Sequence, residues 1–205
     1  MIDKKREPMG RPKSFDVDDV LEKALRLFWE RGYEATSLSD LERVMGLRPP
    51  SIYAAFGNKE TLFKTCADRY VERYSGYVVE ALTKEPTAAE AVMRLLSDTV
   101  DAYVHDTQPR GCLVVSGAIH CPDMDEGPRL VLEQYRKATE AAIATRIERG
   151  QEEGDVPRDV SATMAAKLVA TVMQGFSTQA RDGAGNDDLH RVAKLAVGAL
   201  GLSAV

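Results

Sequence analysis

Cysteine is scarce in this sequence, and long apolar runs are missing from it. Cys66, Cys112 and Cys121 are the three cysteines among 205 residues. An odd and sparse set of this kind indicates a reducing compartment rather than a disulfide framework. No stretch approaches the roughly 18–20 consecutive apolar residues that cross a membrane, and the first residues lack the apolar segment of a secretory signal. We therefore expect a globular cytoplasmic protein without a membrane partner.

The motifs of common enzymes and metal sites are also missing. The sequence contains neither a glycine-rich phosphate loop nor a paired-carboxylate signature. One local group of reactive residue types has a spacing that matches no zinc or nucleophile motif. Its members are His105, Cys112, His120, Cys121, Asp123 and Asp125. We therefore expect no catalytic residue, cofactor or metal ligand, and a metal sensor built from this group is a weaker alternative.

Basic charge is scarce overall but gathers at the start of the chain. The formal net charge is −5, which by itself argues against a nucleic-acid partner. Residues 1–64 hold twelve basic and eleven acidic side chains, and five of the basic ones lie within residues 1–13. Two prolines and a glycine interrupt that segment, which predicts a flexible basic arm. Such an arm is either a solvated tail or a contact to phosphate or to the minor groove of DNA.

Residues 36–63 carry the clearest pattern, two short helices joined by a glycine turn. Apolar side chains recur at helical spacing over residues 37–45. Gly46 ends this helix, because glycine adopts a positive φ without a Cβ clash. Two prolines open the second helix, over residues 49–56. We expect its inner face to carry Ile52, Tyr53 and Phe56 and its outer face Arg48, Ser51, Ala54 and Ala55. This is the pattern of a helix-turn-helix, whose second helix enters the major groove of DNA.

The same region resembles the TetR family of one-component bacterial repressors. The resemblance rests on the run ALRLFWERGYEATS at residues 24–37 and on the order Asp40-Leu41, Gly46-Leu47, Ser51-Ile52-Tyr53, Phe56, Asn58-Lys59-Glu60 and Leu62-Phe63. It covers the first third of the chain without a gap. It implies an all-α homodimer with a helix-turn-helix head at residues 14–60. It further implies a body at residues 61–205 that binds a small-molecule ligand and dimerises, and a palindromic double-stranded operator DNA as partner.

The candidate DNA contacts lie on and beside the second helix of this unit. Arg48 can bond a phosphate or a guanine edge, Ser51 a phosphate or a base, and Ala54 can contact a thymine methyl. The other candidates are Thr36, Ser37, Pro50, Tyr53 and Lys59, of which Tyr53 and Lys59 follow from the resemblance. A helical interaction module without specific DNA binding is the alternative.

The remaining elements are predicted as helices over residues 16–31, 58–82, 87–105, 128–150, 159–181 and 187–200, with a short buried helix at 112–119. By composition residues 112–119 could also form a buried strand, but no partner strand is predicted elsewhere. The last two helices are apolar on more than one face, so they must be covered on more than one side. A four-helix bundle with a second copy provides that cover, and the interior of a monomer is the alternative.

The expected ligand pocket lies among the body helices. From helix position alone, its candidate residues are Tyr103, His105, Tyr135, Met164, Met173 and Phe176, although such side chains at helical spacing are more often core. Cys112 is a candidate thiol sensor, because a helix start beside Arg110 would stabilise its thiolate, with Cys121 as a resolving thiol. The alternative interpretation of Cys112 is a small buried hydrophobe.

Overall fold

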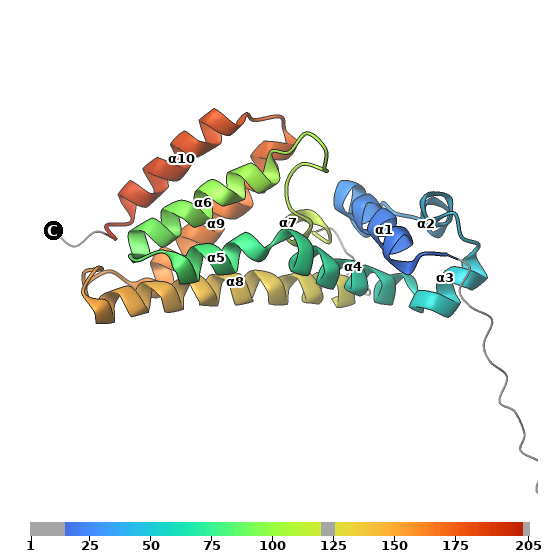
Figure 1. Ribbon diagram of the computed structural model, residues 1–205, viewed down its shortest axis with the longest axis horizontal. Helices are drawn as coiled ribbons and strands as arrows, with labels where there is room; N and C mark the ends of the chain where they lie inside the picture. Colours follow the sequence, from blue (N-terminus) through green and yellow to red (C-terminus); the bar gives the residue numbers. More distant parts are fainter. Residues whose placement is uncertain (1–14, 120–125, 203–205) are drawn as a thin grey trace, which may run out of the picture.

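The computed structural model describes residues 15–119 and 126–202, and all regular structure in these ranges is helical. A small head lies at one end of an elongated body (Figure 1). The head contains α1 (Val17–Arg31), α2 (Leu38–Met45) and α3 (Pro49–Phe56). The body contains α4 (Lys59–Tyr74), α5 (Gly76–Lys84), α6 (Ala88–Tyr103), α7 (Leu113–Ser116), α8 (Glu126–Glu153), α9 (Ala162–Arg181) and α10 (Asn186–Ala199). The expected all-α fold is confirmed. The basic arm at residues 1–13 and Cys121 lie outside the described residues.

Local capping explains why the head helices begin and end where they do. Asp16 caps α1 by accepting from the N–H of Asp18. Ser37 and Asp40 form a reciprocal capping box at the start of α2, which satisfies two N–H groups that would otherwise lack partners. Gly46 ends α2 with φ 66°, a conformation that costs glycine little. The two short helices expected over residues 37–45 and 49–56 are therefore present as α2 and α3, with Gly46 at the turn between them.

The predicted single helix over residues 58–82 is two helices. Ser75, with φ −113° and ψ 7°, separates α4 from α5. Gly76 follows directly, and glycine is a poor residue in a helix interior. The break lets α4 pack against α1 while α5 packs against α6. The prediction of one continuous helix was wrong because both segments carry apolar residues at helical spacing, which conceals a break between them.

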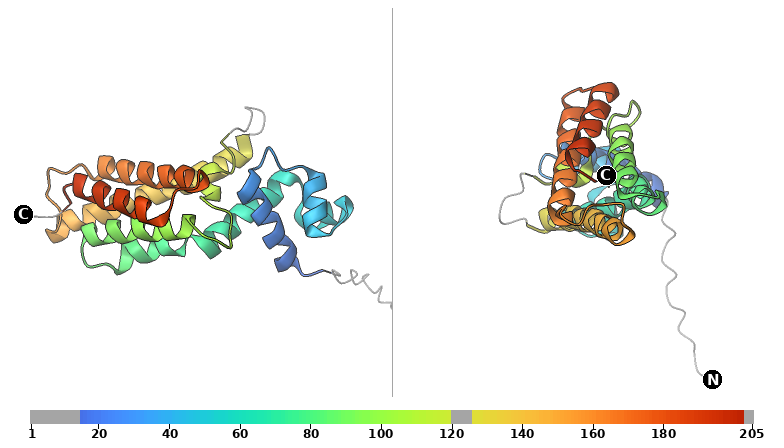
Figure 2. Two further views of the ribbon diagram at one scale, coloured as in Figure 1. Left: turned by 90° about the horizontal axis from the view of Figure 1, so that it is seen from above. Right: turned by 90° about the vertical axis from the view of Figure 1, so that its left-hand side faces the viewer.

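The body is built from long helices that lie roughly along its length. α8 packs against α9, α6 against α10, and α9 also contacts α10 and α6. Figure 2 shows α9 and α10 side by side on one side of the body. These two helices expose large apolar side chains, Met164, Leu168, Val192 and Leu195. None of the described helices is both long and apolar enough to cross a membrane.

Candidate nucleic-acid interface and body cavity

The outer face of α3 is polar or small and is open to solvent. Ile52 and Phe56 are buried beneath it, while Arg48, Ser51 and Ala54 are exposed. Two expectations for this helix were wrong. Tyr53 was expected on the inner face but is 45% exposed. Ala55 was expected outside but is half-buried and packs against the core.

The residues flanking α3 differ in what they can offer to DNA. Thr36 is fully buried, and its hydroxyl donates to the Gly32 carbonyl at 2.7 Å, so it offers nothing to a phosphate in this conformation. Ser37 is exposed but its hydroxyl donates to Asp40 at 2.5 Å. The Lys59 ammonium lies 4.1 Å from the centre of the Tyr33 ring. This cation–π contact holds a positive charge at the start of α4.

The charges beside α3 are fixed by local pairing. Hydrogen bonds from Ser37 and the nearby Arg43 and Arg31 guanidiniums hold the pKa of Asp40 below its usual range. Asp40 therefore stays ionised and keeps Arg43 at 2.6 Å. Pro50 is exposed at the start of α3. Taken together, the face presents one exposed guanidinium, that of Arg48, with hydroxyl and methyl groups, a set that suits phosphate contact plus limited readout of base edges.

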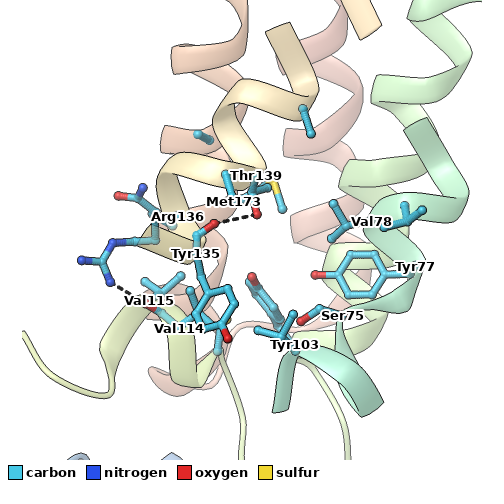
Figure 3. A pocket seen from close by; sticks show the side chains of 17 residues that line it. Ser75, Tyr77, Val78, Tyr103, Val114, Val115, Tyr135, Arg136, Thr139 and Met173 are labelled. Atoms are coloured by element: carbon cyan, nitrogen blue, oxygen red, sulfur yellow. Dashed lines mark hydrogen bonds between the residues drawn. The ribbon is translucent and has the colours of Figure 1, made fainter. Parts of the chain in front are cut away.

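A cavity of about 250 Å³ lies inside the body, between α5, α7, α8 and α9 (Figure 3). Valines and alanines are eight of the 17 residues that line it. Tyr103, Cys112 and Met173 are nearly fully buried within it. Its exposed lining residues, Val79, Ala138, Ala142 and Gln174, mark its opening to solvent. The volume is near the lower end of known ligand sites, which span about 300–1,000 Å³.

Tyrosine hydroxyls give the cavity its polar character. The hydroxyls of Tyr77 and Tyr103 point toward the same part of the cavity (Figure 3). Burial raises the pKa of both tyrosines above the ordinary value, so they stay neutral and can donate hydrogen bonds at physiological pH. The Tyr135 hydroxyl instead donates to Asp68 at 2.6 Å, and burial followed by this bond raises the pKa of Tyr135 to about 12. Arg136 points away from Tyr77 and donates to the Val114 carbonyl.

Only half of the expected pocket residues line this cavity. Tyr103, Tyr135 and Met173 do so. His105 does not, because it follows the end of α6 and accepts from the Thr107 N–H in an exposed turn. Met164 is 65% exposed on α9, and Phe176 is 2% exposed in the core on another side of that helix. Helix position alone could not separate these faces, since α9 is apolar around most of its circumference.

Cys112 is the N-cap of α7, as expected, and its thiol borders the cavity. Arg110 lines a separate groove with Glu30 and Arg181, so the two residues do not share the environment that the thiol-sensor interpretation requires. The Cys112 side chain is 5% exposed. The alternative interpretation, a small buried residue, therefore describes its environment better.

Several cavity residues were not anticipated from the sequence. They include Ser75, Tyr77, Val114, Arg136 and Thr139. The break at Ser75 is what turns Tyr77 toward α6, and the continuous-helix prediction hid it. For Thr139 a weak signal existed, since it lies one turn after Tyr135 on the long helix predicted at residues 128–150. Arg136 directly follows Tyr135 and carried no such signal.

Comparisons with known proteins agree with this geometry. Residues 20–66 match the model described as "Bacterial regulatory proteins, tetR family". Residues 88–195, more than half of the chain, match "Tetracyclin repressor-like, C-terminal domain". The HTH-type transcriptional repressor ComR of Escherichia coli is 30% identical over 92% of this chain and 90% of its own. The repressor BdcR of the same organism is 29% identical over 96% of this chain and 95% of its own.

A solved structure resembles most of the chain. A cysteine-substituted CifR, a TetR family transcriptional regulator complexed with 26 bp double-strand operator DNA, is 38% identical, with a TM-score of 0.90. The alignment covers 93% of this chain and 100% of the CifR chain. Reduced NemR of Escherichia coli, at 19% identity and a TM-score of 0.78, shares the fold. The chain therefore belongs to the TetR family of bacterial regulatory proteins, which are DNA-binding transcription factors and not enzymes.

Proposed function

We propose that this protein is a cytoplasmic homodimeric repressor that binds a palindromic operator through α3 and leaves it when a small molecule fills the body cavity. The observation that carries this proposal is the pairing of an exposed helix-turn-helix face with a mostly apolar cavity, open to solvent at one side, in one chain. CifR, its relative of solved structure, is described in complex with operator DNA, and ComR and BdcR are described as repressors.

The DNA-binding part of the proposal assigns contacts to the face around α3. Arg48, Ser51 and Ala54 would enter the major groove, where guanidinium, hydroxyl and methyl groups meet base edges. Tyr53 and Lys59 would contact the phosphates that border the groove. Because only Arg48 among the α3 candidates carries a charge, we expect base readout to be sparse and backbone contacts to supply much of the affinity.

The dimerisation part of the proposal rests on the apolar surface of the last two helices. Met164, Leu168, Val192 and Leu195 are between 41% and 74% exposed on α9 and α10. An apolar patch spread over two neighbouring helices is typical of a protein interface. A two-fold axis there would form a four-helix bundle and place the two α3 helices about 34–36 Å apart, one turn of B-DNA.

The ligand-binding part of the proposal follows from the chemistry of the cavity wall. Valine, alanine and methionine side chains favour a compact apolar molecule, and neutral Tyr77 and Tyr103 hydroxyls favour an acceptor oxygen within it. We therefore expect a small carbonyl-containing aromatic or aliphatic effector. For release, the ligand must bind the DNA-free form better, and about 1–3 kcal/mol of difference is ordinary for such coupling.

A screen with a matched pair of variants tests this function. Small carbonyl compounds are added to the protein bound to an operator selected from a random library, and release is followed by fluorescence anisotropy. Ala142→Phe blocks the cavity opening, whereas Ala141→Phe adds the same side chain at an exposed neighbour outside the lining. We expect release of the wild type and of Ala141→Phe but not of Ala142→Phe. Equal release of both variants would show that the effector binds elsewhere.

A further inference from the structure

One stripe of α9 reaches from the cavity to the head. Met173 lines the cavity, Ser177 follows four residues later, and Arg181 lies four residues beyond that. Residues spaced by four lie on one face of a helix, so the three side chains form a row about 12 Å long at 1.5 Å per residue. A displacement of α9 at the cavity therefore reaches Arg181 through a single rigid element.

Arg181 binds the C-terminal end of α1. Its guanidinium donates to the Glu30 carbonyl at 2.8 Å and to the Trp29 carbonyl at 3.2 Å. The last four carbonyls of a helix lack intrahelical partners and carry partial negative charge, which a cation stabilises. The same guanidinium lies 3.5 Å from the Ser116 hydroxyl of α7. Arg181 thus holds the end of a head helix from within the body.

The loop between α6 and α7 adds a second link between α1 and α9. We call this link and the Arg181 contact, taken together, the joint. The Trp29 indole donates to the Gly111 carbonyl at 3.0 Å, and the Cys112 N–H donates to the Ser177 hydroxyl at 2.9 Å. A Cβ at Gly111 would lie 2.8 Å from the Ser177 carbonyl oxygen, so this loop presses directly on α9. Helix α1 therefore joins α9 twice, once through its backbone carbonyls and Arg181 and once through the Trp29 side chain and this loop.

We propose that Arg181 is a positioning residue that fixes the orientation of the reading head relative to the cavity helix α9. An effector that moves α9 would shift α1 through Arg181, in addition to any movement carried by α4. This inference rests on the proposed ligand-released repressor. It assigns to α1, which touches no predicted base, a direct part in setting operator affinity.

The test compares Arg181→Ala with Arg110→Ala, since Arg110 lines the same groove. Binding to the operator selected with the wild type is measured by fluorescence anisotropy. We expect Arg181→Ala to weaken binding about tenfold, within the usual range of coupling factors. Arg181→Lys, which can still donate to one carbonyl, should recover part of the loss, and Arg110→Ala should bind like the wild type. Wild-type affinity in Arg181→Ala would overturn the proposal.

Hydrogen–deuterium exchange separates this role from general destabilisation, without DNA. Arg181→Ala should speed exchange in the peptides of α1, α2 and α3 and leave α6 and α10 unchanged, because only the head is released. Faster exchange throughout the chain, or none in the head, would overturn the proposal. If Arg181→Ala does not fold, Arg181→Gln is measured in its place. Failure of the wild type to select any operator would count against the proposed function, while the exchange experiment would still decide the role of Arg181.

Discussion

The reading head and the body cavity are built in opposite ways. The head takes its helices from neighbouring segments, α1, α2 and α3, whose boundaries are set by caps and glycine turns. The cavity gathers its lining from residues as far apart as Val71 and Gln174. A surface built from neighbouring segments is specified by short sequence motifs. A cavity lined by residues far apart in the chain depends instead on the rotation of the long helices relative to one another. The joint at Gly111 and Arg181 has to hold α1 and α9 in a fixed relative position if a change in the cavity is to reach the head.

The largest expected effect comes from breaking this joint at Gly111. Gly111→Ala places a Cβ 2.8 Å from a backbone oxygen of α9 at a residue with φ 78°, so we expect a loss of roughly 2–4 kcal/mol in the free energy of unfolding. Gly183→Ala is the control, because Gly183 also has a positive φ but a Cβ there meets nothing within 4 Å. It should cost about 1 kcal/mol. Equal losses in denaturant unfolding would mean that the clash with α9 is relieved without cost.

Removing the charge of α3 is expected to have the next largest effect. Arg48→Ala should weaken operator binding by about 1–3 kcal/mol without changing thermal stability, because Arg48 is exposed. Anisotropy titrations over a salt series identify the contact. A shallower salt dependence indicates a phosphate, and a relaxed preference at one base pair indicates guanine. Unchanged affinity and unchanged preference would remove Arg48 from the interface.

The cavity should tolerate changes that the joint does not. Tyr77→Phe keeps the ring and removes only a hydroxyl, which lies 3.5 Å from the Thr99 hydroxyl. We expect about 1 kcal/mol or less in stability but a clear loss of response to an effector with an acceptor oxygen. Tyr135→Phe is the control, because its hydroxyl is occupied by Asp68. Effector-driven release from the operator is measured with both variants. A larger loss of response in Tyr135→Phe than in Tyr77→Phe would contradict the assignment of the Tyr77 hydroxyl to the effector.

The smallest expected effect concerns the carboxylate that joins α1 to α4. Glu22 accepts from the Tyr74 hydroxyl at 2.5 Å and from Arg69 at 3.2 Å. Burial by itself raises the pKa of Glu22, but these hydrogen bonds outweigh it, so the pKa lies below its ordinary value. Its contribution is therefore present above the pKa of an unfolded glutamate, about 4.3, and is lost as the pH falls through the lower folded value.

Glu22→Gln measures this contribution. At pH 7 we expect the variant to be about 1 kcal/mol less stable than the wild type, and the difference should shrink as the pH is lowered below about 4. Urea unfolding at several pH values provides the comparison. A difference that grows toward acid would mean that Glu22 is protonated in the folded protein, contrary to its hydrogen bonding.

The sequence predicted the head better than the cavity, for a physical reason. Ser37, Gly46 and the prolines of α3 act within one or two turns of their own position, so their effect can be recognised from spacing. The family resemblance added Tyr53 and Lys59 as backbone contacts. What spacing could not supply was the rotation of α3, which exposes Tyr53, and the burial of Thr36 under the end of α1.

The cavity shows the limit of helix position as a guide. Met164, Met173 and Phe176 all lie on α9 and look alike in the sequence, yet one faces solvent, one the cavity and one the core. Which face is which depends on the packing of α8 and α6 against α9, contacts between segments distant in the chain. The break at Ser75 had the same consequence for Tyr77, because a break in a helix redirects the side chains of the residues that follow it.

The most direct test of the account is selection of DNA from a random library by the purified protein. Binding of the enriched sequence and of a scrambled control is then measured by anisotropy across salt concentrations. We predict enrichment of a palindrome that binds at least about 10³-fold more tightly than the control, with affinity that falls as salt rises. Failure to enrich any sequence, or equal affinity for both DNAs, would contradict the assignment of α3 as a sequence-reading helix.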